Sequence, residues 1–167
     1  MGILQPHERH RGQARRNALG QTGTKTAFVV HSPRHAVAAL RAGEATGIPI
    51  VLASPQGAGG SLGAPWFLEV LAAAAEAVPK AAFTAALDCG DAPGHVQAAL
   101  RAGVKTTVFS GPPATRRKLA AIAEALGAKV LAKLGSPRVL DLAGAEDPDA
   151  ACEAFLRSFT PKPSKGK

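Results

Sequence analysis

The sequence predicts an α/β fold in which about five parallel strands alternate with helices. Apolar runs that suit buried strands alternate along the chain with amphipathic stretches of helical period. In addition, PRHAVAALRAG (33–43) and PGHVQAALRAG (93–103) share eight of eleven residues at an offset of 60 positions. Two strand–helix units of roughly 30 residues each account for that offset. We therefore interpret the two segments as copies of a duplicated pair of units.

The expected strands are short runs rich in apolar and β-branched residues. IPIVLAS, for example, is a continuous apolar run bounded by Gly47 and Pro55, as expected of a buried strand. The strands are expected at 27–31, 48–54, 81–88, 104–110 and 128–134, with a short sixth strand at 138–142.

Helices are expected between these strands. Ser32 as N-cap and Pro33 as the first helical residue predict a helix that stops near Gly43, and Asp147 and Pro148 predict the start of the closing helix. The remaining helices are expected at 66–78, 94–102 and 116–127. This alternation suits half of a TIM barrel, with strand order 1-2-3-4-5, or a flavodoxin-like sheet, with order 2-1-3-4-5.

One domain, at 27–160, is expected between a disordered basic tail at 1–26 and a basic C-terminal tail at 161–167. Apolar residues make up 46% of the 167 residues, enough for a single core. No apolar run approaches the roughly 18 residues of a membrane span, and the start lacks a hydrophobic signal core. The two cysteines form no CxxC pair, so we expect a reduced, cytoplasmic protein.

The net charge of +8 lies mostly in the two tails. Residues 1–26 carry +4 and residues 161–167 carry +3, which leaves +1 for the domain. Basic tails can contact nucleic-acid phosphates weakly and without specificity, although most such tails only keep a protein in solution. No aromatic residues are interleaved with the charges, so the tails offer no stacking platform for single strands.

A glycine-rich segment, GAGGSLG (57–63), allows two interpretations. Glycine amides before a helix can bind a phosphate, but Leu62 breaks the dinucleotide-binding pattern and no GK[ST] follows. The alternative is a flexible surface loop or lid. Nearby, Trp66 is expected to pack on the sheet. His35 and His95 occupy matching first-turn positions of the repeat, and we expect exposed side chains without a role there, because a helix N-terminus disfavours a protonated imidazole.

Candidate functional residues lie where the expected strands end. The carboxyl ends of parallel strands meet at one edge of a sheet, where α/β proteins bind ligands. Asp88 and Cys89 are the candidates for catalysis, and the candidates for ligand binding are His31, Ser54, Asp91, Ser110 and Gly111. We expect any pocket to gather these seven residues at that edge.

The segment LDCGD (87–91) resembles the LDHGD-like segment of the class II fructose-bisphosphate aldolases. ATGIPIVLASPQGAGG resembles the second strand and following loop of that family, VQAALRAGVKTTVFSG its next helix and strand, and LAAIAEALGAKVLAKLG the helix and strand after those. The resemblance covers about residues 27–136 in the family's order. It implies the N-terminal half of a TIM-type barrel.

The chain differs from the family at the residues that the family uses for catalysis and zinc binding. The family's motif has an Asp that handles substrate protons and a His that binds the catalytic zinc. Here these positions hold Asp88 and Cys89, and Lys133 replaces a Glu of a later motif. The other zinc and phosphate ligands belong to the family's second half-barrel. We therefore expect a small-ligand or partner-binding domain without aldolase activity or a cofactor, although a thiolate can bind zinc.

Two other functions remain open, together with one expectation about assembly. An enzyme of changed chemistry could use Asp88 with Cys89 as nucleophile, provided that the thiol pKa is lowered. A nucleic-acid-associated protein could act through the basic tails. Because five strands of a barrel cannot close and exposed edges invite pairing, we also expect a homodimer.

Overall fold

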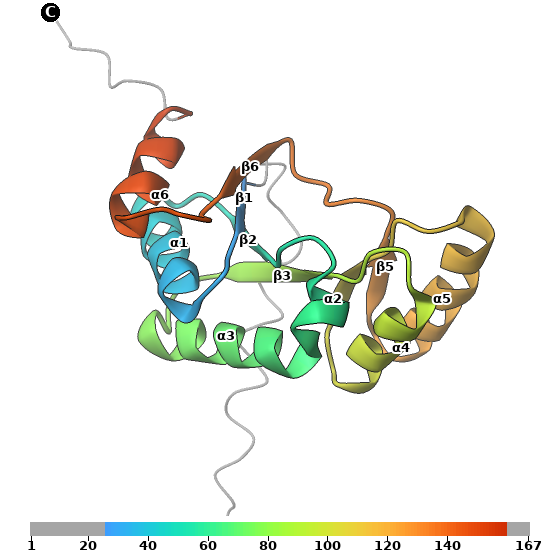
Figure 1. Cartoon of the computed structure of the whole chain (residues 1–167). Coiled ribbons are helices and arrows are strands. Elements are labelled where there is room, and N and C mark those ends of the chain that lie inside the picture. Colours follow the sequence, from blue (N-terminus) through green and yellow to red (C-terminus); the bar gives the residue numbers. More distant parts are fainter. Residues whose placement is uncertain (1–25, 160–167) are drawn as a thin grey trace, which may run out of the picture.

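The computed structural model describes residues 26–159, and these form one parallel sheet with helices between the strands (Figure 1). The basic tails of the sequence analysis lie outside the described residues, apart from Thr26. The elements in chain order are β1 (Thr26–Val29), α1 (Pro33–Thr46), β2 (Ile50–Ala53), α2 (Ala58–Ser61), α3 (Gly63–Ala77), β3 (Phe83–Asp88), α4 (Pro93–Arg101), β4 (Thr106–Val108), α5 (Pro113–Ala125), β5 (Lys129–Leu131), β6 (Arg138–Asp141) and α6 (Pro148–Arg157).

The strands pair in the order β5-β4-β3-β2-β1-β6, and every pair is parallel. The predicted α/β class is thus confirmed, with six strands instead of about five because the short run near residue 140 pairs with β1. The first five strands are adjacent in chain order. This is the order required by the half-barrel alternative, and the flavodoxin-like order 2-1-3-4-5 is not found.

All helices of the described chain pack on one face of the sheet. Side chains alternate between the two faces of a strand, and the register places Phe28, Leu52 and Ala85 in one row on the same face. Phe28 and Leu52 are buried among residues of α1, α3 and α6, while Leu87 and Phe109 meet α3, α4 and α5 on that same face. In Figure 1 the helices follow one another along the outside of the strands from α6 to α5. Helices on one face alone are typical of a barrel wall.

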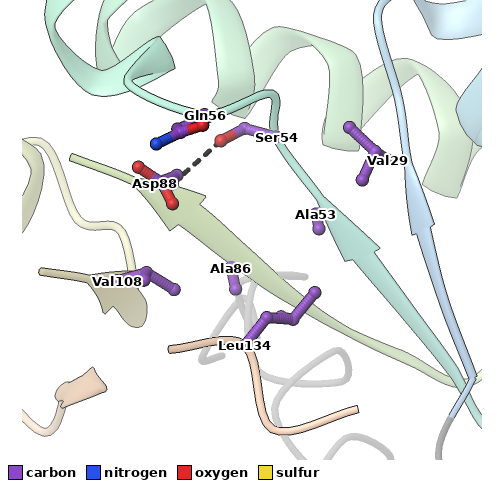
Figure 2. A pocket seen from close by; sticks show the side chains of 8 residues that line it. All are labelled: Val29, Ala53, Ser54, Gln56, Ala86, Asp88, Val108 and Leu134. Carbon is purple, nitrogen blue, oxygen red and sulfur yellow. Dashed lines mark hydrogen bonds between the residues drawn. The ribbon is translucent and has the colours of Figure 1, made fainter. Parts of the chain in front are cut away.

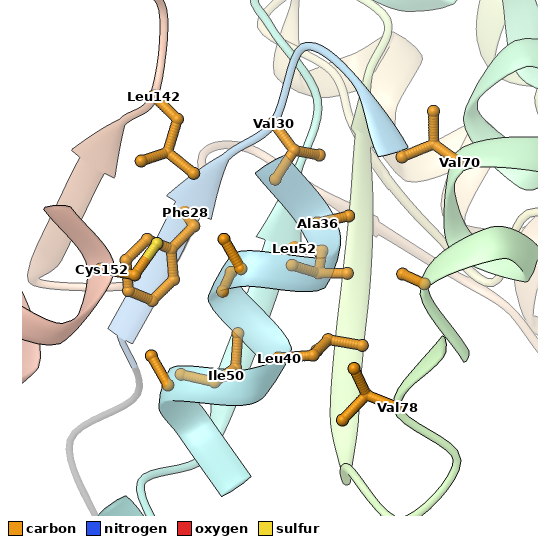
Figure 3. Close-up of a cluster of buried hydrophobic side chains, with 14 of the residues drawn as sticks. Phe28, Val30, Ala36, Leu40, Ile50, Leu52, Val70, Val78, Leu142 and Cys152 are labelled. Atoms are coloured by element: carbon orange, nitrogen blue, oxygen red, sulfur yellow. The ribbon is translucent and has the colours of Figure 1, made fainter. Parts of the chain in front are cut away.

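The larger core cluster lies between β1, β2 and the helices α1, α3 and α6 (Figure 3). Phe28 is fully buried there and meets the ring of Phe155 edge to face, with ring centroids 5.8 Å apart. Leu40 of α1, Val70 of α3 and Cys152 of α6 are buried in the same cluster. Since α6 contributes to this core, the closing helix fixes the strand pair β1–β6 at the end of the sheet.

Helix α1 is longer than the sequence predicts. Its N-terminus is as expected, since the Ser32 side chain accepts a hydrogen bond from the backbone N–H of His35. The expected stop near Gly43 is wrong, because α1 continues to Thr46 and ends at Gly47, whose φ of 68° suits glycine. Gly43 permits close packing instead: a Cβ there would lie 2.3 Å from Cγ1 of the buried Ile50.

The sheet ends in two short strands, β5 and β6, which are not paired with each other. Val139 of β6, on the helix-free face, is 45% exposed. None of the helices within residues 26–159 is long and apolar enough to cross a membrane. The homodimer expected from unpaired edges stays a prediction, and these two strands are where it would form.

Candidate functional site

Asp88, the last residue of β3, ties two loops together at the carboxyl edge of the sheet. Its Oδ1 accepts hydrogen bonds from the backbone N–H groups of Gly57 and Gly90, each 2.9 Å long. Both glycines have positive φ, 69° and 61°, a conformation that other residues rarely adopt. The carboxylate therefore holds the loop after β2 against the loop after β3, and its second oxygen, Oδ2, has no hydrogen-bond partner within residues 26–159.

Ser54 supports Asp88 from the neighbouring strand. The Ser54 Oγ accepts a hydrogen bond of 2.8 Å from the backbone N–H of Asp88 and donates one of 3.0 Å to the carbonyl of Pro55. The side chain is buried and its single proton is used. Ser54 therefore positions Asp88, and its predicted role in binding a ligand stays a prediction.

A cavity of about 240 Å³ lies beside Asp88 on the helix-free face (Figure 2). Within the part of the chain that the structure describes, its polar lining comes from Ser54, Gln56 and Asp88, and no basic residue lines it. The apolar lining comes from four strands and from the connection between β5 and β6: Val29, Ala53, Ala86, Val108 and Leu134. The cavity thus presents one carboxylate and one amide above an apolar floor.

Cys89 lies on the other face of the sheet from Asp88. Neighbouring residues of a strand point to opposite faces, and Cys89 is buried in the helix-side cluster with Ala58 and Val96. Burial, followed by the charge of Asp88, raises the pKa of the Cys89 thiol to about 11. The structure therefore places the two candidates for catalysis on opposite faces of the sheet, and the buried Cys89 side chain does not line the cavity beside Asp88.

We expect both cysteines of the folded protein to resist a thiol reagent at neutral pH. Cys89 and Cys152 are buried and unpaired, and burial raises the pKa of Cys152 to about 12. Since the thiolate is the reactive form, reaction with Ellman's reagent should be slow until urea unfolds the chain, and two thiols should then react. Rapid labelling of one thiol without denaturant would contradict this.

His31 lies just beyond β1 and joins β6 through its side chain. His31 Nε2 and Asp141 Oδ1 are 2.6 Å apart, and the same Oδ1 accepts a hydrogen bond of 2.8 Å from the backbone N–H of Ala143. Burial by itself would raise the pKa of Asp141, but the hydrogen bonds from Ala143 and His31 lower it overall. Asp141 is therefore a firmly ionised partner for His31.

The other predicted ligand-binding residues do not line the cavity. Asp91 is exposed in the loop before α4, and Ser110 is exposed while its backbone N–H bonds to the Gly90 carbonyl. Gly111 packs on the ring of Phe109, where a Cβ would lie 2.3 Å from Cζ. Of the seven candidates the cavity therefore brings together only Ser54 and Asp88.

The glycine-rich segment is neither a flexible loop nor an open phosphate cradle. Residues 58–61 form the short helix α2, and α3 begins directly after it at Gly63. A Cβ on Gly59 would lie 2.8 Å from Cys89 Sγ, and one on Gly60 would lie 2.3 Å from the exposed His95 ring. Gly59 and Gly60 thus allow α2 to pack closely against Cys89 and His95. Trp66 packs against both core clusters, as predicted.

A second cavity, of about 320 Å³, lies at the opposite edge of the sheet. Only the last two residues of β3 pair with β4, so the two strands separate toward their amino ends. The lining there is mostly apolar and includes Phe67, Leu71 and Phe83. The expectation that cavities lie only at the carboxyl edge of the sheet is therefore wrong.

Comparison with known proteins gives no family assignment. No protein-family model matches the chain, and no curated protein matches it. Within residues 26–159, no three side chains of His, Cys, Asp or Glu are grouped so that they could share a metal ion. The function must therefore be argued from the site itself.

Proposed function

We propose that this protein binds a small, uncharged or cationic polar molecule in the cavity beside Asp88. The proposal rests on the hydrogen bonding of the two Asp88 carboxylate oxygens. Oδ1 is fixed by two backbone N–H groups, whereas Oδ2 has no partner within the described residues and belongs to a side chain that lines a cavity. A preorganised acceptor above an apolar floor is typical of sites for small molecules.

The charge of the cavity selects the class of ligand. Asp88 supplies a negative charge, and among residues 26–159 no lysine, arginine or histidine lines the cavity to offset the negative charge of a ligand. A phosphorylated ligand would place its own negative charge near Asp88 in a partly desolvated site, which is unfavourable. A hydroxyl or an ammonium group, in contrast, can donate to Oδ2, and the Gln56 amide can donate to a ligand oxygen.

The proposal includes no cleavage of fructose bisphosphate. The residue that stands in place of the aldolase zinc histidine is Cys89, which is buried on the helix side of the sheet. The substrate of that reaction carries two phosphates, which the cavity charge disfavours. Two unpaired, buried cysteines support the proposed cytoplasmic location, because reducing compartments keep thiols free.

Binding is tested by NMR with dihydroxyacetone and, for comparison, with its phosphate. Because the amides of Gly57 and Gly90 donate to Asp88, their resonances report directly on a hydrogen bond to its carboxylate. We expect saturable shifts of both resonances with millimolar dihydroxyacetone and weaker binding of the phosphate. Asp88→Asn should weaken binding by about tenfold or more, since a hydrogen bond to a charged group contributes about 1.5–3 kcal/mol.

Asp91→Asn is the matched control, because it removes an exposed carboxylate three residues away that does not line the cavity. This variant should bind dihydroxyacetone as the unchanged protein does. Equal loss of binding in both variants, or tighter binding of the phosphate than of the neutral compound, would show that the cavity charge does not select the ligand.

A further inference from the structure

The second cavity, at the edge of the sheet where the strands begin, lies where β3 changes its pairing partner. Residues 83–86 of β3 pair with β2, whereas only Leu87 and Asp88 pair with β4. The first half of β3 therefore has a neighbouring strand on one side only. Residues 103–106, which lead into β4, line the cavity together with residues of α3 and β3. Within residues 26–159 the two cavities share no lining residue.

Most of the wall of this cavity is apolar. Helix α3 contributes Phe67, Leu68 and Leu71, and β3 contributes Phe83. Leu71 lies four residues after Phe67 and three after Leu68, so the three side chains share one side of the helix. Leu68, Leu71 and Phe83 are only half-buried. An apolar molecule in the cavity would complete their burial, which is favourable.

The polar part of the lining carries a positive charge. Lys105, Thr84 and Thr106 line the cavity, and within the described residues no acidic side chain does. The Lys105 ammonium donates one hydrogen bond, of 3.4 Å, to the Leu126 carbonyl. Because an ammonium has three N–H groups, Lys105 can still donate to a ligand. The second cavity is thus opposite in charge to the cavity beside Asp88.

The surroundings of Lys105 are also basic. The backbone N–H of Lys129 donates to the Lys105 carbonyl at 2.9 Å, which places the two lysines side by side at the start of β4 and β5. Arg101 ends α4 shortly before the cavity. Glu124 is the only acidic residue of the segment 92–140, which contains eight lysines and arginines. An anion near Lys105 is therefore attracted by the charge of the whole segment.

The volume of the cavity limits the length of the ligand. An apolar cavity of about 150 Å³ holds one benzene molecule, and this cavity, of about 320 Å³, is about twice as large. A ligand of roughly ten to twelve non-hydrogen atoms therefore fits by this comparison. One alkyl chain of medium length with a small end group has this size, whereas a lipid with two long chains is too large.

We propose that the second cavity binds a medium-chain carboxylate such as octanoate, with the alkyl chain against α3 and the carboxylate at Lys105. The chain covers the half-buried side chains of Leu68, Leu71 and Phe83, and the carboxylate accepts a hydrogen bond from the Lys105 ammonium. The site is independent of the function proposed at Asp88. It lies at the opposite edge of the sheet, and it takes an anion, which the cavity beside Asp88 disfavours.

Binding is tested by NMR with octanoate, used well below the concentration at which it forms micelles. Gly103 and Thr106 line the cavity, so their backbone amides report on it. We expect saturable shifts of both resonances with millimolar octanoate, while the amides of Gly57 and Gly90, beside Asp88, stay unchanged. No saturable shift of Gly103 and Thr106, or shifts of Gly57 and Gly90 in their place, would overturn the proposal.

The charge of the end group is tested with octylammonium, which has the same chain length and the opposite charge. Octanoate should bind about tenfold more tightly, because attraction to Lys105 is replaced by repulsion. Lys105→Gln should weaken octanoate binding by about fivefold, the upper range for an exposed ion pair. Lys118→Gln, at an exposed lysine of α5 outside the cavity lining, is the matched control and should bind octanoate within twofold of the unchanged protein. Equal affinities for octanoate and octylammonium would show that the cavity does not select an anion.

The place of the alkyl chain is tested by filling the cavity. Leu68→Trp adds an indole ring to the wall and should weaken octanoate binding by about tenfold or more. Leu62→Trp is the matched control, because Leu62 is 49% exposed in the link between α2 and α3, and it should bind octanoate within twofold of the unchanged protein. Unchanged binding in a folded Leu68→Trp variant would mean that the chain lies outside the cavity.

Hexanoate carries the same test without a substitution, and it decides the matter if circular dichroism shows that Leu68→Trp does not fold. Each buried methylene group strengthens binding by about threefold to fourfold. Hexanoate lacks two of them and should bind about tenfold more weakly than octanoate to the unchanged protein. Equal affinities of the two carboxylates would mean that the alkyl chain is not buried, and the proposal would be wrong.

Discussion

Replacing Phe28 by alanine should lower the free energy of unfolding by about 3–5 kcal/mol, the usual range for a buried phenylalanine. Phe28 is fully buried at the junction of β1 with α1 and α6, and its ring meets Phe155 edge to face. Alanine would leave a cavity lined by elements from both ends of the chain. Because domains of this size are stable by about 5–15 kcal/mol, this single change removes a large share of the total.

Urea denaturation followed by circular dichroism measures the effect. Leu62→Ala is the control, because this leucine is 49% exposed in the link between α2 and α3. The control should change stability by less than about 0.5 kcal/mol, as surface substitutions usually do. A loss below about 1 kcal/mol for Phe28→Ala would mean that β1 and α6 do not share a core.

Local sequence pattern predicted the elements well because each signal is contained in one element. Continuous apolar runs such as 50–53 indicate buried strands, and Ser32 and Asp147 cap helices through contacts three residues away. The pairing of β6 with β1 was not predictable in this way. It joins residues more than 100 positions apart, and in isolation β6 is a four-residue strand with alternating exposure.

The same contrast between local signals and long-range contacts holds for the residues of the candidate site. The end of β3 was predicted as a site, and Asp88 does line a cavity there. Sequence alone also indicates that Asp88 and Cys89 do not share a site, because adjacent residues of a strand point to opposite faces. Asp141 could not have been found, since it meets His31 only through the β1–β6 pairing. Gln56 carries no local signal beyond its place after a strand.

Replacing Asp88 by alanine should cost about 2–4 kcal/mol of stability, although the side chain is not fully buried. Two backbone N–H groups, of Gly57 and Gly90, donate to one carboxylate oxygen. A hydrogen bond to a charged group contributes about 1.5–3 kcal/mol, and the two bonds share one acceptor, so their contributions do not simply add. Both loops at the carboxyl edge lose their common anchor in this variant.

The asparagine variant separates this structural role from the charge of Asp88. Asparagine keeps an Oδ1 that can accept both hydrogen bonds, so Asp88→Asn should lose only about 1 kcal/mol. Asp91→Ala, in the same loop, should change stability by less than about 0.5 kcal/mol. Urea denaturation gives the three values, and amide hydrogen exchange at Gly57 and Gly90 should quicken in the alanine variant alone. Equal losses for alanine and asparagine would mean that charge, and not the two hydrogen bonds, holds the loops together.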